Sequence, residues 1–532
     1  MSAGRRRTRN GVLVLVFVVA ASVGVGLSGL IAWGHPILAA RWSMLWSLAA
    51  WAVAWVVAAV VAGSLPRRIS LGLVLLAAVA LRVAALAGPP TTSDDLYRYA
   101  WDGRVQAAGM DPYANPPSAP AVARLRQPWL WPDAAGCAGL HRPAGCTRIN
   151  RPDARTIYPP VAEAWFASVY RLSGISAKHK AWQVAGLVAD LAAVACILVA
   201  LRRRGGDVRR LAWYALCPAP VFEFVNNAHV DGLAVALAVG AVLVLSPPRA
   251  ARRLPRRLSG RFSGRFSGHF TRRLPRRLLW SEAARDVAFG TLVGAAALVK
   301  LYPALLLLIV LGAKRSRPWL SFTRAAAAAG SLALVTYLPH VLSAGVRVLG
   351  YLPGYLREEH YVQGGRFLLA GTIGLSGWQA GAASAAVLVI AVGWVVVTRP
   401  DPVTAASVLL GALFVATTPV QPWYAAGLVA FAALDGWPWI ISITLAGYPY
   451  FFAVILDYRH AAGLGRAAYG AALAVVSVAW LGRRQLQARG GLRGGHDAHV
   501  DRAAAVEPAV AAGPVPGGEH RPGGAGPVTE RL

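Results

Sequence analysis

The residues best suited to chemistry are two adjacent carboxylates, Asp94 and Asp95, in the polar stretch between Pro89 and Pro117. They follow directly on an apolar run and open a long segment of mixed polar and aromatic composition. A positioned carboxylate can take the proton of an attacking hydroxyl group, a role worth roughly 10²–10⁴-fold in rate. Aspartate is also a common N-cap, and a helix is predicted to begin at Leu96. The pair therefore predicts either a general base or a helix cap.

Other charged and polar side chains lie within or beside apolar runs, where a charge costs roughly 2.5–3.5 kcal/mol at mid-membrane. They are Arg82, Asp190, Glu223, His229, Asp231 and Lys300. We expect all of them toward the side of the membrane that carries the two acids, where a helical bundle can gather them into one cavity. An ion pair between Arg82 and Asp190 is the alternative role for those two residues. The segments 355–367 and 418–424 add His360, Arg366 and Trp423.

The composition requires elements that place these residues at a membrane. The chain has 532 residues, 56% of them hydrophobic, with recurring apolar runs. Runs of roughly 17–23 residues match a hydrocarbon layer of about 30 Å, and continuous rather than alternating runs predict helices. We therefore expect an all-α, polytopic transmembrane bundle of about 14 segments with both termini inside. The expected segments are 11–33, 42–63, 69–87, 182–201, 211–225, 230–247, a hairpin within 287–313 turning at Lys300–Pro303, 321–338, 379–398, 403–418, 423–435, 438–456 and 464–481.

The charge pattern predicts the orientation. The net charge is +31, but the arginines cluster in alternate loops and the acids fall in the intervening ones. This positive-inside pattern indicates a multi-pass protein of the plasma membrane rather than a partner of nucleic acids. It places the loop 88–180 outside and the Arg-rich insertion 249–285 in the cytoplasm. The membrane domain is expected to cover 1–484, and the tail 485–532, rich in Gly, Ala, Pro and Arg, to be disordered and cytoplasmic.

The cysteines and the absence of several well-known motifs limit the kinds of site that the chain can contain. Cys137 and Cys146 both fall in the predicted outer loop, where a disulfide is permitted, and the sequence leaves open whether they are bridged. The chain has no His/Cys cluster with zinc spacing, no phosphate-binding glycine loop and no serine elbow, so we expect no metal and no cofactor. Outside the membrane there are no nucleotide sugars, so an activated donor used there must be carried by a lipid.

Five motifs follow one another over roughly residues 70–480: SDDLYRYAWDGR with GMDPY, TIYPP, NNAHVDG, LVKLYPALLLL and PVQPWY. In these motifs the chain resembles bacterial GT-C glycosyltransferases, especially the actinobacterial mannosyltransferases that depend on polyprenyl-phosphate-mannose. The resemblance implies Asp95 as catalytic base with Asp94 in support, and Lys300 at the donor phosphate. We expect Arg82 or Arg366 to help neutralise the charge that develops on the phosphate. The implied substrate contacts are Tyr99, Asp102, Tyr158, His229, Asp231, Tyr302, His360 and Trp423.

The function that the resemblance implies is transfer of a hexose, with mannose as the expectation, from a polyprenyl-phosphate donor. The acceptor would be a cell-envelope glycan or glycolipid on the outer face, and the anomeric carbon would be inverted. A lipid-linked sugar flippase or transporter is the alternative, because it would use the same intramembrane charges as a substrate path. A membrane scaffold would need no buried acids. The sequence does not identify the sugar, the acceptor or the linkage.

Overall fold

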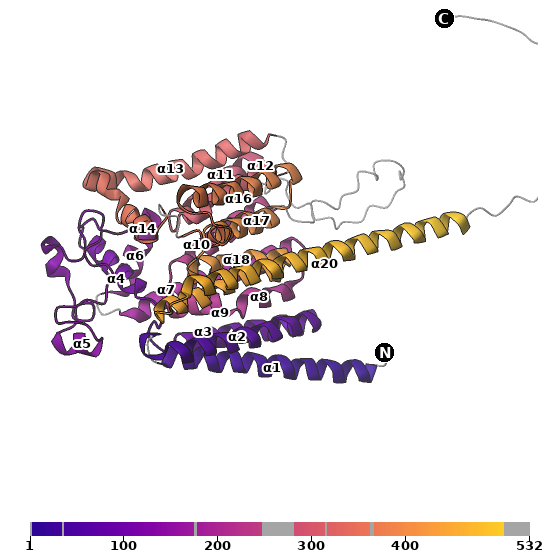
Figure 1. Ribbon diagram of the computed structural model, residues 1–532, viewed down its shortest axis with the longest axis horizontal. Coiled ribbons are helices and arrows are strands. Elements are labelled where there is room, and N and C mark those ends of the chain that lie inside the picture. Colours follow the sequence, from indigo (N-terminus) through magenta and orange to yellow (C-terminus); the bar gives the residue numbers. More distant parts are fainter. Residues whose placement is uncertain are drawn as a thin grey trace, which may run out of the picture. The chain divides into compact units, whose positions relative to one another are not determined.

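The computed structural model describes residues 3–34, 37–174, 178–246, 281–313, 317–361 and 366–504. Within these ranges every regular element is helical and none is a strand (Figure 1). Eight helices in the described ranges are long and apolar enough to cross a membrane. They are Arg5–Trp33, Ala40–Ser64, Arg67–Ala85, His179–Arg203, Pro318–Glu358, Gly377–Thr398, Pro438–Ile455 and Ala461–Gln485. The chain is thus an all-α protein with several helices of membrane-spanning length.

These long stretches correspond to a simple set of elements. They are α1 (Ala3–Trp33), α2 (Ile37–Ser64), α3 (Arg67–Ala85), α7 (His179–Arg203), α13 (Pro318–Ala344), α16 (Gly377–Thr398), η8 with α19 (Pro438–Ile440 and Ile441–Ile455) and α20 (Ala461–Ala504). Other predicted spans are shorter: α10 (Asp231–Leu245), α11 (Glu282–Ala297), η6 with α12 (Tyr302–Leu308 and Ile309–Gly312), α17 (Pro402–Ala416) and α18 (Pro422–Asp435). A full crossing needs about 20 helical residues, so the length of these helices does not support the expected count of full spans.

The span predicted at 211–225 is wrong as a single helix. The chain there forms η2 (Val208–Leu211), α8 (Ala212–Ala215), α9 (Pro218–Pro220) and the π-helical turn η3 (Val221–Asn226). Proline lacks the N–H group that continues a helix, and Pro218 and Pro220 break this one at Cys217. The apolar run hides these breaks because apolarity alone does not report helix continuity.

The hairpin predicted at Lys300 is confirmed. Helix α11 ends at Ala297 and η6 begins at Tyr302, and these two elements pack against each other. The turn between them is short, and the backbone N–H of Lys300 still donates to the carbonyl oxygen of Ala296 at 3.0 Å. The hairpin therefore presents Lys300 at its tip.

Between α3 and α7 the chain forms four short helices with a hydrophobic core of their own. They are α4 (Asp95–Ala107), η1 (Pro120–Leu125), α5 (Ala134–Gly139) and α6 (Pro160–Ser173). Leu96 and Trp101 of α4 and Phe166 of α6 are fully buried in this core. A Cβ atom on Gly103 would lie 2.5 Å from the carbonyl oxygen of Phe166, so the close approach of α4 and α6 requires glycine there.

The segment 88–174 is also tied to the end of α13 and the turns that follow it, η7 (Gly345–Leu349), α14 (Leu352–Glu358) and α15 (Leu368–Thr372). Asp111 pairs with Nδ1 of His340 at 3.1 Å, and Arg151 pairs with Glu358. Burial alone would raise the pKa of Asp111, but hydrogen bonds from His340 and Ser343 outweigh it and lower that pKa. In Figure 1 the labels α4, α6 and α14 lie at the same end of the helices.

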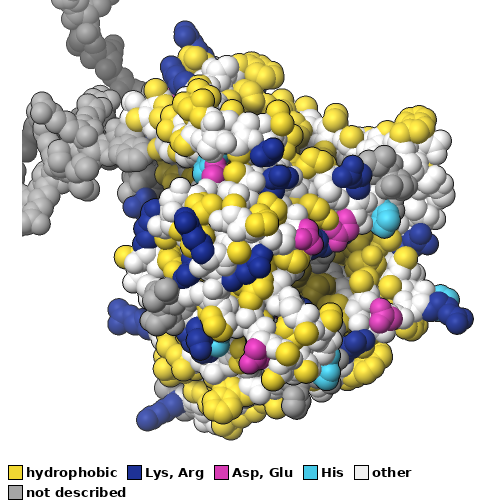
Figure 2. Space-filling model, turned by 90° about the vertical axis from the view of Figure 1, so that its left-hand side faces the viewer, with side chains coloured by type: hydrophobic (Ala, Val, Ile, Leu, Met, Phe, Trp, Pro, Cys, Tyr) yellow, Lys and Arg dark blue, Asp and Glu magenta, His cyan; other side chains and the backbone are white. Residues whose placement is uncertain are grey.

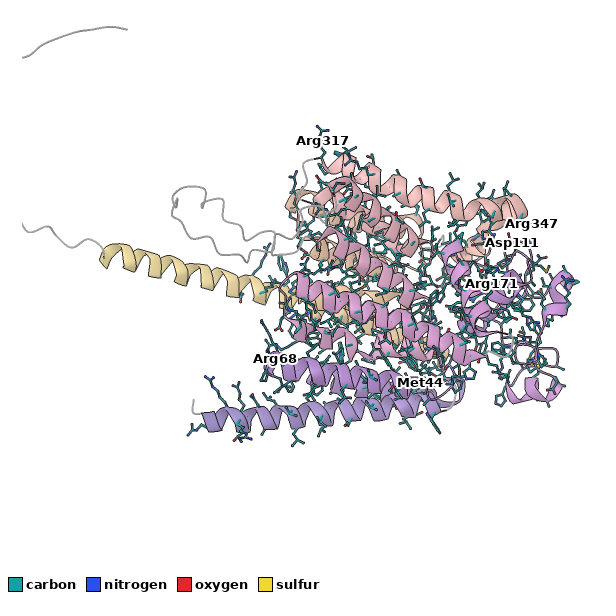
Figure 3. All side chains as sticks on the ribbon, turned by 180° about the vertical axis from the view of Figure 1, so that it is seen from behind. Met44, Arg68, Asp111, Arg171, Arg317 and Arg347 are labelled. Carbon is teal, nitrogen blue, oxygen red and sulfur yellow. A yellow bond between two sulfur atoms is a disulfide. The ribbon has the colours of Figure 1, made fainter. Side chains whose placement is uncertain are left out.

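In Figure 3, Arg68 and Arg317 lie at one end of the helices, whereas Asp111, Arg171 and Arg347 lie at the other, so the labelled basic residues occur at both ends. Most of the Arg-rich insertion 249–285 lies outside the described residues, as does the segment 505–532. The backbone of α20 continues to Ala504, past residue 485, where the sequence predicts a structureless tail.

Candidate active site

Asp94 and Asp95 lie at the start of α4. The end of the molecule at which Figure 1 labels α4 faces the viewer in Figure 2. That face is hollowed near its middle, and acidic and basic side chains gather around the hollow. Two neighbouring cavities open among the elements at this end, and both reach the Lys300 hairpin. The sequence-predicted acids and lysine are therefore brought together.

The cap interpretation of the two acids is not supported. Asp94 occupies the N-cap position, yet its side chain makes no capping hydrogen bond. The N–H of Asp95 donates instead to Oγ of Ser93 at 3.2 Å. Both carboxylates therefore point to partners outside the helix that they precede.

Asp95 is the deeper of the two acids. Its side chain is 19% exposed, and Nδ2 of Asn150 donates to Oδ1 at 2.8 Å. Its other oxygen, Oδ2, lies 3.6 Å from Nδ1 of His229. The carboxylate is thus held between a neutral amide and a neutral or charged imidazole at the wall of the cavity.

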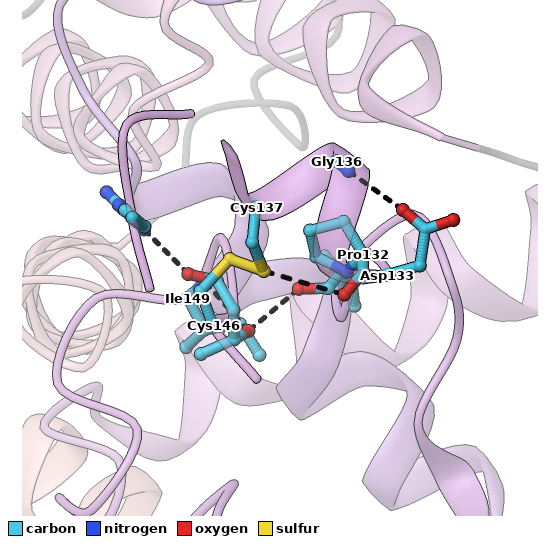
Figure 4. Close-up of a disulfide and its surroundings, with 9 residues drawn as sticks. Pro132, Asp133, Gly136, Cys137, Cys146 and Ile149 are labelled. Carbon is cyan, nitrogen blue, oxygen red and sulfur yellow. Dashed lines mark hydrogen bonds between the residues drawn. A yellow bond between two sulfur atoms is a disulfide. The ribbon is translucent and has the colours of Figure 1, made fainter. Parts of the chain in front are cut away.

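Asp94 is 44% exposed and pairs with Arg142, whose Nη2 lies 3.0 Å from Oδ2. Partial burial raises the pKa of Asp94, and the guanidinium of Arg142 opposes this shift. Arg142 belongs to a short loop closed by the disulfide Cys137–Cys146, with Cα atoms 5.8 Å apart (Figure 4). The bridge that the sequence left open is therefore present, and the loop that it closes carries the partner of Asp94.

The first cavity, here the polar chamber, has a volume of about 340 Å³. Its walls carry both acids and a set of hydrogen-bonding side chains, among them Thr92, Arg98, Asn150, Arg155, Glu359, Gln421 and Trp423. Hydroxyl-rich molecules such as sugars are recognised by such convergent donors and acceptors, combined with aromatic faces. The chamber is suited to a polar, uncharged or weakly charged ligand beside Asp95.

The second cavity, here the apolar chamber, has a volume of about 260 Å³. Its walls are mainly aliphatic and aromatic: Leu301, Tyr302, Leu352, Leu356, Leu413, Phe414 and Val420. Arg366 also lines it, is nearly buried and pairs with Glu359, a residue of the polar chamber. Helices α14, α17 and the Lys300 hairpin thus enclose a cavity that suits an apolar ligand chain, with the guanidinium of Arg366 at its border.

Lys300 lines both chambers, together with Ile157, Tyr158, Tyr355 and Tyr424. Its Nζ lies 5.0 Å from the ring centre of Tyr158 and 4.8 Å from that of Tyr424, so two aromatic faces hold the ammonium group. Asp231, at the start of α10, lies 3.6 Å away. The junction of the polar and apolar chambers therefore carries a nearly buried cation.

Arg82 lies elsewhere. Its Nε lies 2.6 Å from Oδ2 of Asp190, its Nη1 donates to the carbonyl oxygen of Ala215, and it lines neither chamber. Asp190 also accepts a hydrogen bond from Tyr214 at 2.8 Å. The ion-pair alternative for Arg82 and Asp190 is confirmed, and a contact of Arg82 with a phosphate beside Lys300 is not supported.

Three other expected substrate contacts lie outside the chambers. Asp102 is buried, and its two carboxylate oxygens share the Nε–H donor of Arg98, at 2.8 and 2.9 Å. Tyr99 is buried with its ring stacked on Phe166 at 4.4 Å, behind Tyr158. His360 is exposed and lines neither chamber. Asp102 and Tyr99 therefore support the site from within the α4–α6 core.

The expected residues Tyr158, Tyr302 and Trp423 do line the chambers, and His229 lies against Trp423. The ring of His229 is stacked on that of Trp423, with centroids 4.3 Å apart and planes 13° apart. Asp231 is fully buried and reaches the site through Lys300.

Several functional neighbours were not predicted: Asn150, Arg142, Arg155, Tyr355, Glu359, Gln421 and Tyr424. Asn150 and Arg142 come from loop sequence with no periodicity, so no local signal marks them. Tyr424 and Gln421 belong to the PVQPWY motif, of which the sequence analysis selected only the tryptophan. Tyr355 and Glu359 flank the expected His360 and face the chambers in its place.

No cluster of three or more His, Cys, Asp or Glu residues that could hold a metal ion occurs in the described part of the chain. Comparisons of the chain with protein-family models, with curated proteins and with solved structures find no match. The site is therefore interpreted from its own geometry.

Proposed function

We propose that this protein is an integral membrane glycosyltransferase that moves a hexose, mannose by expectation, from a polyprenyl-phosphate donor to a glycan or glycolipid acceptor. The observation that carries the proposal is the position of Lys300 at the junction of the apolar and polar chambers. A lipid-phosphate sugar has the same order of parts: an apolar chain, an anionic phosphate and a hydroxylated ring. The apolar chamber suits the chain, Lys300 the phosphate, and the polar chamber the sugar.

The reaction follows from this placement. The acceptor hydroxyl attacks the anomeric carbon while its proton passes to Asp95, and the bond from that carbon to the phosphate oxygen breaks. The bonding electron pair leaves with the phosphate, whose charge Lys300 and Arg366 neutralise in a water-poor site. One displacement without a covalent enzyme intermediate inverts the anomeric carbon, so a β-linked donor yields an α-glycoside.

Two further points support the proposal. The order of motifs in the chain resembles that of GT-C glycosyltransferases, and the motif residues Asp95, Tyr158, Lys300 and Trp423 surround one site. Asp111, in the same segment as the two acids, lies at the end of the helices opposite to Arg68 and Arg317 (Figure 3), and the charge pattern of the sequence predicts that this end lies outside the cell. We therefore place the site at the outer face of the plasma membrane, in a large extracytoplasmic loop.

The test uses the purified full-length protein in liposomes, with radiolabelled polyprenyl-phosphate-mannose, -glucose and -arabinose as donors and a total glycolipid extract as acceptor. The proposal predicts label in a glycolipid product with an α-linkage. Movement of the labelled donor between leaflets without formation of a new glycosidic bond would instead identify a flippase.

A further inference from the structure

His229 is a buried histidine placed between two carboxylates. Its Nδ1 lies 3.6 Å from Oδ2 of Asp95, and its Nε2 lies 3.6 Å from Oε2 of Glu223. Among the described residues neither ring nitrogen has a hydrogen-bond partner. A buried polar group without a partner costs roughly 1–3 kcal/mol, so this arrangement needs a reason.

The distance of 3.6 Å is too long for a hydrogen bond, but it is close to one. Catalytic hydrogen bonds are often long in the absence of substrate and shorten when it binds. A movement of less than about 1 Å of either carboxylate would bring its oxygen within hydrogen-bond reach of the imidazole. Two such small displacements, one on each side of the ring, would complete a continuous chain of proton-carrying groups.

The imidazole itself is held in place. Its ring lies flat against Trp423, and the backbone N–H of His229 donates to the carbonyl oxygen of Glu223 at 2.9 Å. This backbone bond fixes His229 and Glu223 as one unit at the end of η3. Any adjustment on substrate binding thus falls on the carboxylate side chains of Asp95, at the chamber wall, and of Glu223.

Glu223 is equipped to receive a proton. It is buried and lines neither chamber, and its Oε1 accepts a hydrogen bond from the hydroxyl of Tyr448 at 2.8 Å. Its Oε2, the oxygen that faces His229, accepts only a long bond of 3.3 Å from Nδ2 of Asn227. The carboxylate oxygen of Glu223 that faces the imidazole therefore accepts the longer hydrogen bond of the two.

The charged groups around the imidazole come from four elements. Asp95 belongs to α4, Glu223 to η3, Lys300 to the α11–η6 turn and Asp231 to α10. Lys300 and Asp231 pair with each other at 3.6 Å, so the two acids flanking the ring are the groups that can exchange a proton with it. Tyr448 lies behind Glu223.

From this arrangement, and resting on the proposed transfer reaction, we infer that His229 and Glu223 form a proton relay behind Asp95. The acceptor proton moves first to Asp95. The imidazole, carrying its hydrogen on Nε2, then takes that proton at Nδ1 and releases the Nε2 proton to Glu223. Asp95 returns to a carboxylate, the imidazole stays neutral and Glu223 becomes a carboxylic acid; the reverse path returns the proton to the polar chamber after the product leaves. His229 acts through Asp95 and does not touch the substrate.

The experiment measures single-turnover transfer from radiolabelled polyprenyl-phosphate-mannose to the glycolipid extract, in the full-length protein. His229→Gln and Glu223→Gln should each slow the transfer step at least about tenfold, while donor KM changes less than about twofold. The double variant should be no slower than either single variant, because each substitution alone already interrupts the same proton path. His460→Gln, at an exposed histidine, is the matched control and should keep the wild-type rate.

Two readouts separate a relay from a packing role. In mixtures of light and heavy water, a plot of the wild-type transfer rate against deuterium fraction should be curved, because several protons move. The same plot for His229→Gln should be a straight line. Added imidazole should restore transfer in His229→Ala, because it can occupy the space against Trp423. If His229→Gln has a poor yield, the isosteric Glu223→Gln carries the same comparison.

The relay would be overturned if both single variants transferred sugar at the wild-type rate, or if their losses multiplied in the double variant. It would also be overturned if the curved dependence on deuterium fraction remained in His229→Gln. A loss confined to KM would overturn it as well. Absence of transfer by the wild-type protein would reject the proposed function, whereas active wild-type protein with these contrary results would reject the relay alone.

Discussion

At the residue scale, the two acids differ in what surrounds them. Asp94 is half-exposed and directs an oxygen to Arg142, whereas Asp95 is deeper and keeps Oδ2 facing His229. In the proposed reaction, an acceptor in the polar chamber meets Asp95 as the acid with an available oxygen. Asp94 lines the same chamber, whereas Arg142 pairs with Asp94 and is not one of the lining residues.

Lys300 provides the first prediction. Lys300→Met should lower turnover roughly 10²–10³-fold, because the phosphate charge that develops on bond cleavage loses its fixed cation. Transfer of labelled sugar is measured with the purified variant. Lys178→Met, at an exposed lysine before α7, is the matched control. Near-normal turnover of Lys300→Met would mean that the lysine only extends its amine toward the surface.

At the element scale, the α4–α6 pair determines where Asp95 points, and its core contains a second pair of acids. Glu163 of α6 is fully buried, and it accepts hydrogen bonds from Oγ1 of Thr156 at 2.6 Å and from Nε2 of Gln106 at 2.7 Å. Burial, reinforced by the nearby charge of Asp102, raises the pKa of Glu163 well above its ordinary value. The folded segment therefore favours the protonated form of this carboxyl more than the unfolded chain does.

This linkage has a definite sign. When folding raises the pKa of an acid, the unfolded chain ionises at a lower pH than the folded chain does. The free energy of unfolding should therefore fall as pH rises above the ordinary glutamate range. Between about pH 5 and pH 8 the melting temperature of the wild type should decrease, and that of Glu163→Gln should decrease less. Asp153→Asn, at an exposed carboxylate, should behave as the wild type. Parallel melting curves for wild type and Glu163→Gln would refute the buried proton.

The sequence predicted elements better than contacts. Helices α4 and α6 and the Lys300 hairpin were predictable, because apolar periodicity and prolines act locally. The breaks within 208–226 were not predicted, because the continuous apolar run suggested a single helix in spite of Pro218 and Pro220. The pairing of Asp95 with Asn150, and of Asp111 with His340, joins residues far apart in the chain, so no local pattern could reveal it.

At the scale of the whole molecule, Arg68 and Arg317 lie at one end of the helices, and Asp111, Arg171 and Arg347 at the other (Figure 3). The orientation proposed from the alternating basic loops of the sequence puts the Arg68 end in the cytoplasm. With Cys196 and Cys217 replaced by serine, Ser118→Cys should react with an impermeant maleimide on intact cells. Arg68→Cys should react only after permeabilisation. The opposite pattern would put the site on the cytoplasmic side and remove the reason for a lipid-carried donor.

The most direct test of the central claim is sugar transfer by Asp95→Asn, compared with Asp94→Asn in the same liposome assay. Asparagine keeps the size and hydrogen bonding of the side chain but cannot take the acceptor proton. Asp95→Asn should reduce transfer roughly 10²–10⁴-fold with donor binding intact, and Asp94→Asn by about tenfold or less. If both variants transfer sugar at the wild-type rate, neither acid is the base and the assignment of this site as a glycosyltransferase centre is contradicted.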